Sequence, residues 1–399
     1  MTQNNNMDKQ NNMDKQLKFN SQGEFTILQL SDVQDLHYMR HAQDELIRLA
    51  CERVRPDLVV YTGDNILGNH IRDARLGSKK YDLTKAQEHD VIMRALYRAF
   101  RWPQKMGIPF AVIFGNHDDM NQVTKDEHGD IIRSYSMNRG FENTGELAGT
   151  YCLPIYSSDG SDTRLLLYMI DTSTYDKEEH RSHEEITRAE SDWFRAQTAA
   201  DKAAHGGAAT DSLMFMHIPL KESEYFVEEC APEVADAVEN GVGLRLRREE
   251  TGVKGSLGES IGPVADEYGF YDAVLENGGV RSIISGHNHL NNFEGMRDGI
   301  RFIATPGASF RCYGNEERGV RVFRLREDAP GDFDTYVLHY YDLAGDTPLT
   351  HFKYFWDADE MEKTKWTAIA GAAAGAAAVA VTAAGLGRIP SGLIRRLFK

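Results

Sequence analysis

Two histidines, His287 and His289, stand two residues apart in the stretch GHNHLNNF, directly after the apolar run RSIIS. Imidazole is a common ligand of transition metals, and it is also a common polar group on solvated loops. A lone His-x-His pair does not separate these two interpretations. It indicates a metal site only if other parts of the chain bring further ligands to the same place.

Polar residues also follow four other apolar runs of the chain. These runs are ILQLS, LVVYTG, AVIFG and LMFMH, and each has the composition of a buried strand. Ligands of open α/β sheets bind beyond the carboxyl ends of strands, so residues that follow parallel strands meet at one edge. One such residue is readily explained as a turn former, but five runs that end in this way favour a shared metal site. The residues concerned are Asp32, Asp64, Asn116, His117, Asp118, His217, His287 and His289.

The side chains of this set suit two divalent ions. They offer carboxylate, amide and imidazole groups and need no thiolate, which favours Mn, Fe, Zn or Co over copper(I) or an iron–sulfur cluster. Two ions about 3.5–4 Å apart need a bridging carboxylate, and together they clamp the attacking and leaving oxygens of an in-line displacement. Water bound to such an ion ionises near neutral pH and becomes the nucleophile.

Strands and helices alternate along the chain, which predicts an α/β fold. The late run of strands indicates a second sheet packed on the first. Strands are expected over residues 25–31, 57–63, 109–115, 164–170, 212–217, 280–285, 300–305, 319–325 and 334–341, and helices over 42–54, 86–106, 184–204 and 263–276.

Two segments between strands, 121–153 and 221–262, are too long for ordinary loops and are expected to be functional or disordered. The second contains RLRREE, which either supplies cations to a substrate phosphate or forms a solvated charged face.

The net charge of -16 argues against broad nucleic-acid binding, because an acidic surface repels phosphate backbones. The four cysteines are scattered without a Cys-x-x-Cys pair, which favours a reducing compartment. Residues 1–20 are polar and repeat NNMDKQ, so we expect a disordered lead rather than a signal peptide, and a cytoplasmic location.

The main domain is expected over residues 21–345, followed by a linker over 346–365. Residues 366–387 are rich in Ala and Gly, and from Thr367 to Gly387 they carry no charge. They are as long as a membrane-anchoring helix, but they also suit an ordinary Ala/Gly-rich helix or linker. The tail 388–399 is basic and ends in SGLIRRLFK, which could lie in a membrane interface. Membrane association through this end of the chain is therefore one expectation.

The series SDVQ, TGDN, FGNHDD, MHIP and SGHNH resembles the motifs of the calcineurin-like metallophosphoesterase family, over roughly residues 25–341. The family series is D-x-H, G-D, G-N-H-D/E, H and G-H-x-H. The longer strings HIPLKE and GHNHLNNF resemble its purple-acid-phosphatase-like branch. The resemblance implies a four-layer αββα sandwich, in which two mixed β-sheets lie face to face and helices flank them.

The resemblance also implies a role for each residue. Asp32 and His289 would hold the first metal, and Asp64 would bridge both metals. His117 would donate a proton to the leaving oxygen or stabilise the transition state as a cation, with Asp118 orienting its ring. The remaining expected ligands are Asn116, His217 and His287 for the second metal, with Gln34 and Asn291 as weak ligands or outer partners.

Two residues depart from the family pattern. Gln34 stands where the family has histidine, so the first metal would be held loosely or through water; the alternative is a shifted match at Asp35 and His37. Leu67 stands where purple acid phosphatases have a tyrosine ligand, so no purple Fe(III) centre is expected.

The leading hypothesis is a binuclear metallophosphoesterase that hydrolyses a phosphate ester by attack of metal-bound hydroxide. The alternative enzyme is a phosphodiesterase acting on a nucleotide or a lipid headgroup. A metal-binding pseudoenzyme or partner-binding protein is the alternative of another class. Gln34 supports it, and the intact GNHD motif weighs against it.

Overall fold

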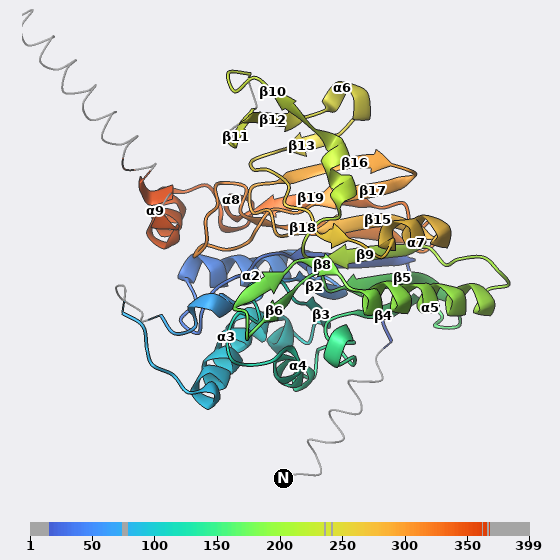
Figure 1. Cartoon of the computed structure of the whole chain (residues 1–399), viewed down its shortest axis with the longest axis horizontal. Helices are drawn as coiled ribbons and strands as arrows, with labels where there is room; N and C mark the ends of the chain where they lie inside the picture. Colours follow the sequence, from blue (N-terminus) through green and yellow to red (C-terminus); the bar gives the residue numbers. More distant parts are fainter. Residues whose placement is uncertain are drawn as a thin grey trace, which may run out of the picture.

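Two large β-sheets form the centre of the molecule (Figure 1). The computed structural model describes residues 16–73, 79–234, 237–240, 242–360, 362–364 and 367. In the first sheet β1, β2 and β3 run parallel, and β18 and β19 continue it antiparallel beyond β1. Its order is β19 (Asp334–His339), β18 (Gly319–Arg326), β1 (Glu24–Leu30), β2 (Leu58–Thr62) and β3 (Phe110–Ile113).

The second sheet has a parallel centre and antiparallel edges. Strands β5, β9, β15 and β17 are parallel, whereas β4, β16 and β13 pair antiparallel. Its order is β13 (Lys254–Ser256), β16 (Asn292–Arg297), β17 (Ile300–Ala304), β15 (Val280–Ser285), β9 (Ser212–Met216), β5 (Thr163–Ile170) and β4 (Tyr151–Tyr156).

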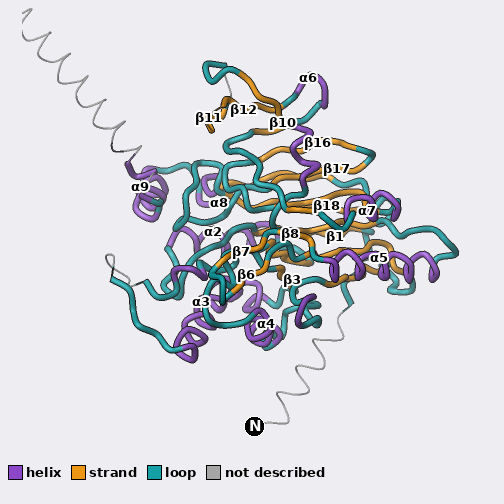
Figure 2. Tube along the Cα trace, in the orientation of Figure 1, coloured by secondary structure: helices purple, strands orange, loops and turns teal. Residues whose placement is uncertain are grey.

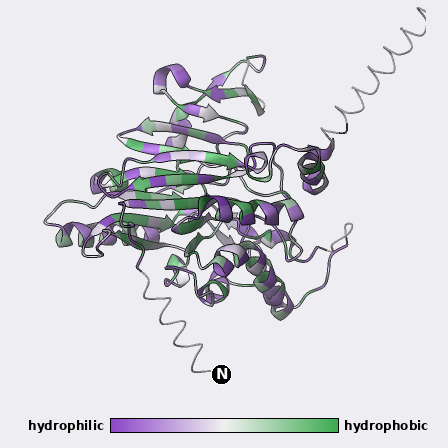
Figure 3. Cartoon of the chain, turned by 180° about the vertical axis from the view of Figure 1, so that it is seen from behind, coloured by the Kyte–Doolittle hydropathy of each residue, from purple (hydrophilic) through white to green (hydrophobic). Residues whose placement is uncertain are grey.

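Alternation along β9 shows that the two sheets lie face to face. Successive side chains of a strand point to opposite faces of its sheet. Leu213 and Phe215 belong to the core shared with the first sheet, whereas Met214 and Met216 belong to a second core outside it. The ring of Phe215 meets the ring of Phe323 in β18 edge-on, with centroids 5.9 Å apart. Viewed from behind, the strands carry much of the hydrophobic green in Figure 3.

Helices cover the outer faces of both sheets, as the purple segments of Figure 2 show. The core of the first sheet includes residues of α2 and α3, and the outer core of the second includes residues of α5 and α7. The expected four-layer αββα sandwich is therefore confirmed. The helices are α2 (His41–Val54), α3 (Lys85–Met106), α4 (Lys125–Arg133), α5 (Arg188–Ala204), α6 (Arg248–Thr251), α7 (Phe270–Asn277), α8 (Tyr340–Ala344) and α9 (Pro348–Asp357), with 3₁₀ turns at Gly68–His70, Gly145–Leu147 and Lys221–Phe226.

The two long segments carry structure of their own. Segment 121–153 contains α4, which Thr124 and Glu127 cap reciprocally. Segment 221–262 contains α6, β13 and a small sheet of β10 (Val227–Cys230), β12 (Val242–Leu246) and β11 (Val238–Asn240). Two further pairs are β14 (Ala265–Asp266) with β8 (Glu185–Ile186), and β6 (Thr174–Asp176) with β7 (Arg181–His183).

Regular structure extends into two of the expected flanking segments. Leu17 and Phe19 are buried, and Phe19 N donates to Tyr156 O at 3.0 Å, so ordered structure begins before residue 20. The expected linker 346–365 contains α9, because Thr347 caps a helix whose Tyr354 packs into the core. Apart from Thr367, the expected anchoring segment 366–387 and the tail 388–399 lie outside the described residues. None of the described helices combines the length and the apolar character that crossing a membrane requires.

Candidate metal centre

The loops that follow five parallel strands meet at one edge of the sandwich. Asp32, Asp64 and His217 follow β1, β2 and β9, and each offers a ligand atom within 4.8 Å of the others. All three are buried. We call the six expected ligands together the strand-end cluster: Asp32, Asp64, Asn116, His217, His287 and His289.

Asp32 presents one bonded and one open carboxylate oxygen. Its Oδ2 accepts from Ser31 Oγ and, at 3.0 Å, from His287 N. Its Oδ1 lies 3.6 Å from His289 Nε2 and 4.0 Å from His217 Nδ1, and it has no hydrogen-bond partner among the described residues. A buried carboxylate oxygen left open between two imidazoles has the geometry of a metal ligand.

Asp64 lies between the two halves of the cluster. Its Oδ1 accepts from His117 N at 2.9 Å and is 3.5 Å from His217 Nε2. Its Oδ2 accepts from Gln34 Nε2 at 2.6 Å. Asp64 therefore contacts residues from three of the other loops, which is the place that a bridging carboxylate would occupy.

Backbone carbonyls set the tautomers of two histidines. His217 Nδ1 donates to Thr62 O, and His289 Nδ1 donates to Tyr313 O, each at 2.9 Å. The Nε2 lone pair of each ring then faces the cluster, where His217 Nε2 is 3.1 Å from Asn116 Oδ1. Metal-binding histidines commonly have their second nitrogen fixed in this way.

The backbone at the cluster is strained. Among the described residues, eight non-glycine residues have positive φ, and four of them are Asp32 (50°), Gln34 (40°), Asp64 (49°) and His287 (67°). Such conformations cost about 1–3 kcal/mol each and concentrate at functional sites. The sheets hold these loops in a conformation that the residues would not adopt alone.

Two glycines make the close approach of the loops feasible. A Cβ at Gly63 would lie 2.6 Å from the ring of His217, and one at Gly286 would overlap the hydroxyl of Ser31. The glycine before His287 thus lets this turn lie directly against the β1 loop. The adjacent His287 ring meets the His217 ring edge-on, with centroids 5.1 Å apart.

Burial disfavours charge on every ionisable group of the cluster. It raises the pKa of Asp32 to about 6 and that of Asp64 to about 8, and the Glu184 and Asp119 carboxylates add to the second shift. Burial lowers the pKa of His287 to about 2 and that of His289 to about 4. The residues therefore fit divalent cations, which would neutralise the acids and accept the imidazole lone pairs.

The model of the family described as calcineurin-like phosphoesterase matches residues 25–291. The chain belongs to this family. It is 24% identical over 339 residues to a protein from Arabidopsis thaliana named "Probable inactive purple acid phosphatase 29", covering 76% of this chain and 77% of that protein. It is also 24% identical over 345 residues to "Phosphatase DCR2" from Saccharomyces cerevisiae, covering 76% of this chain and 52% of that protein. The solved structure of a dimetal phosphatase from Danio rerio is 13% identical, with a TM-score of 0.44, and covers 79% of this chain and 99% of that one.

His117 of the calcineurin-like motif GNHD lies beside the cluster. Its backbone N–H is held by Asp64, and its ring Nδ1 is buried without a hydrogen-bond partner among the described residues. Burial lowers the pKa of this imidazole. The expectation that Asp118 orients the ring was wrong. Asp118 Oδ2 accepts from Gly115 N and Asn65 Nδ2, and Oδ1 accepts from Ile66 N, so this carboxylate fastens two cluster loops together.

Asn291 lies in the turn that carries His289. Its Oδ1 accepts from Gly258 N at 2.9 Å and Glu259 N at 3.0 Å, which ties segment 257–262 to the turn that carries His289. Its only ligand oxygen is thereby occupied. Of the two roles expected of Asn291, these contacts favour an outer partner that joins two loops over a weak ligand.

The shifted first motif at Asp35 and His37 is disfavoured. Asp35 Oδ1 accepts from Leu36 N and Arg311 Nε, and Oδ2 accepts from Arg40 N. Both carboxylate oxygens of Asp35 therefore already accept hydrogen bonds. Gln34, in contrast, keeps its Oε1 buried and without a hydrogen-bond partner in the described part of the chain. Asp32 and Gln34 are therefore the members of this motif that face the cluster.

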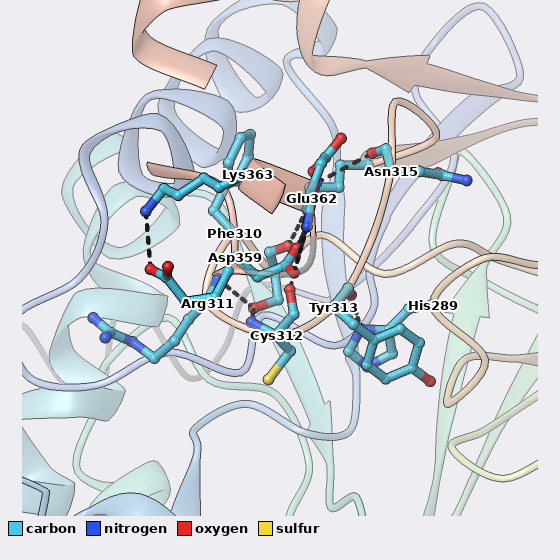
Figure 4. Close-up of polar contacts among 12 residues, drawn as sticks. His289, Phe310, Arg311, Cys312, Tyr313, Asn315, Asp359, Glu362 and Lys363 are labelled. Carbon is cyan, nitrogen blue, oxygen red and sulfur yellow. Dashed lines mark hydrogen bonds and ion pairs between the residues drawn. The ribbon is translucent and has the colours of Figure 1, made fainter. Parts of the chain in front are cut away.

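Sequence reasoning missed two residues that contact the proposed ligands, Tyr313 and Glu184. The Tyr313 ring stacks on His289, with centroids 4.4 Å apart and planes 9° from parallel (Figure 4). Glu184 Oε1 accepts from Asn116 Nδ2 at 3.2 Å, which turns Asn116 Oδ1 toward His217. Neither residue lies in a recognisable motif, so no local signal pointed to them.

Proposed function

We propose that this chain hydrolyses phosphate esters with two divalent cations bound at the strand-end cluster. The observation that carries the proposal is the open Oδ1 of Asp32, buried between His289 and His217 and beside Asp64. Asp32 and His289 would hold the first cation. Asn116, His217 and His287 would hold the second, and Asp64 would contact both.

The cations would activate a water molecule as the nucleophile and neutralise charge on the phosphoryl oxygens. The protein's own residues orient the site. Thr62 O and Tyr313 O fix the two imidazoles, Asn65 and Asp118 join the loops, and Gln34 holds Asp64. These contacts place the ligands before substrate binds, so little reorganisation is needed in the reaction.

His117 is proposed as the proton donor to the leaving oxygen. Its ring is partly exposed, and its Nδ1 is not used by the surrounding described residues. His117→Ala should retain metal and lose about 10²–10⁴-fold in turnover, the usual contribution of a general acid. His70→Ala is the matched control, because His70 is a nearby, more exposed histidine paired with Asp73. Full turnover of His117→Ala on a substrate with a poor leaving group would refute this role.

The arginines of RLRREE do not supply an open phosphate site. Arg245 pairs with Glu228 at 2.6 Å, Arg247 donates to Tyr225 O, and Arg248 donates to Gly255 O. This favours the solvated charged face over a substrate-binding role. This segment therefore does not favour a nucleotide or lipid phosphodiester as the substrate. The assay below compares a monoester with a diester.

The second candidate function is metal binding without turnover. Gln34 favours it, because an amide is a weaker ligand than the histidine of the family pattern. The relative from Arabidopsis thaliana carries the word "inactive" in its name. Against it stands the retained His117, which a binding protein would not need.

One assay separates the candidates. The protein is stripped with a chelator, reloaded with Mn²⁺ and mixed in single turnover with an aryl phosphate monoester or a bis-aryl diester. Metal-dependent release of the aryl alcohol is expected. Two bound ions per chain without hydrolysis of either ester would support the binding protein, and failure to bind metal would refute both candidates.

A further inference from the structure

Helix α9 presents an unusual apolar surface. Leu349, Phe352 and Trp356 are 64%, 59% and 65% exposed, the three highest values among the large hydrophobic residues of the described chain. Their spacing of three and four residues places them on one side of the helix. The rings of Phe352 and Trp356 stack, with centroids 6.0 Å apart. We call these three residues the α9 face.

The opposite side of α9 is firmly attached to the domain. Tyr354 is buried, and its hydroxyl donates to Asn315 O at 2.6 Å. Lys353 Nζ pairs with Glu45 at 2.9 Å, and Asp357 Oδ2 accepts from Ala42 N at 2.6 Å. The helix therefore has one defined orientation, and the exposure of the α9 face is not a consequence of loose packing.

The position of α9 leaves this face accessible. Figure 1 shows α9 at the periphery of the molecule, beside the layered body and not within it. A contiguous group of exposed apolar residues on a folded domain commonly marks an interaction site. The question is which partner covers it.

The sequence after α9 identifies the chemistry of that partner. No charged residue occurs from Thr367 to Gly387, and Arg388, Arg395, Arg396 and Lys399 follow. Trp356 and Thr367 are eleven positions apart, which span at most about 40 Å even when extended. Aromatic side chains favour the interface of a bilayer, apolar segments its interior, and basic residues its anionic headgroups.

We propose that the α9 face docks on a lipid bilayer that contains anionic headgroups, next to the segment 367–399. The proposal does not depend on the proposed hydrolysis. A second copy of the chain is a poorer occupant, because a stable interface buries about 800 Å² on each partner and three side chains supply far less. A bilayer requires no such complementary area.

Trp356 can report the contact directly. The full chain in a Trp366→Phe background is mixed with vesicles of phosphatidylcholine and phosphatidylglycerol whose acyl chains carry bromine, a quencher of tryptophan fluorescence at contact. Quenching is expected, and most of it should disappear in Trp356→Phe, which keeps an apolar ring and therefore vesicle binding. Vesicle binding without quenching of Trp356 would overturn the proposal, as would a lack of vesicle binding.

Co-sedimentation with the same vesicles tests the whole α9 face. Leu349→Ser/Phe352→Ser/Trp356→Ser should reduce the bound fraction at least about tenfold, the change expected from losing several buried apolar side chains. Met93→Ser/Tyr97→Ser/Met296→Ser is the matched control, because it removes three exposed hydrophobic residues elsewhere and should bind normally. Equal binding of both variants would overturn the proposal. A change of oligomeric state confined to the α9 variant would also overturn it, in favour of a second copy.

Discussion

Two clusters of buried charged groups lie near each other in this protein, and they are built in opposite ways. The first is the strand-end cluster. The second, the Arg318 clasp, consists of Arg318, Tyr354, Asp359 and Glu362. In the clasp Arg318 donates to Asp359 Oδ2 and to Tyr354 Oη at 2.6 Å, and also to Glu362. Its buried cation has two carboxylate partners.

The strand-end cluster lacks that internal compensation. Its carboxylates face imidazoles whose charged forms burial disfavours, and one oxygen of Asp32 stays open. In the clasp, burial alone would lower the pKa of Arg318, yet Tyr354, Glu362 and Asp359 raise it above its usual value. The buried charges of the clasp are compensated by one another, whereas the carboxylates of the strand-end cluster are placed to accept cations from outside.

A single loop connects the two clusters. Arg318 Nε donates to Ser309 O at 2.5 Å, and Nη2 donates to Cys312 O at 3.2 Å. The next residue, Tyr313, accepts from His289 and stacks on its ring. The clasp thus fixes the loop that orients one proposed metal ligand.

Removal of the shared carboxylate should have the largest effect on function. Asp64→Ala takes away the group placed to contact both cations, so both ions and all metal-dependent hydrolysis should be lost. Elemental analysis of the dialysed protein measures the first effect. Asp298→Ala is the control, since Asp298 also has positive φ but is exposed. Two ions per chain in Asp64→Ala would show that the bridge is misassigned.

Removal of the clasp cation should have the largest effect on stability. Arg318→Met removes the buried cation that Asp359 and Glu362 share, and breaking such an ion pair costs about 3–5 kcal/mol of unfolding free energy. Denaturant titration measures the change. Arg326→Met breaks the exposed ion pair with Asp328, whose shortest N–O distance is 2.7 Å, and should leave the denaturation midpoint unchanged. Equal losses of unfolding free energy in Arg318→Met and Arg326→Met would show that the buried ion pairs contribute no more to stability than the exposed one.

The two clusters should respond with opposite signs to loss of a charge. In chelator, Asp64→Asn removes a carboxylate that burial disfavours, and Gln34 can turn its amide to accept from the new side chain. The melting temperature should therefore rise slightly, whereas it falls in Glu362→Gln. Added Mn²⁺ should raise the melting temperature of the wild type but not of Asp64→Asn. A lower melting temperature of Asp64→Asn in chelator would contradict the idea that this cluster is electrostatically incomplete.

The smallest effect concerns the first motif. Gln34→His should lower the metal concentration needed for half-maximal activity by about tenfold, within the range that groups around a metal commonly change its affinity. His37→Ala should leave it unchanged, because Asp35 is committed to Arg311. Metal titration of activity compares them. A sharp rise of metal demand in His37→Ala alone would move the first ligand to the shifted motif.

The strand-end ligands were predictable because their signal is local. Each of the loops carrying Asp32, Asp64 and His217 directly follows an apolar strand, and parallel pairing brings such ends to one edge. Asp118 was misread for the opposite reason. Its partners come from residues 65, 66 and 115, and nothing in the order of the chain distinguishes a carboxylate that joins loops from one that orients a ring.

The sequence by itself determined the alternation of strands and helices, the set of proposed ligands and the departure at Gln34. These features follow from periodicity and motif spacing, which are properties of neighbouring residues. Only the tertiary structure decided that Arg318 reaches Glu362, that Tyr313 supports His289, and that α9 turns its aromatic side outward. These outcomes depend on contacts between distant segments. Which side of a helix is buried, and which charge finds a partner, is settled by packing and not by local pattern.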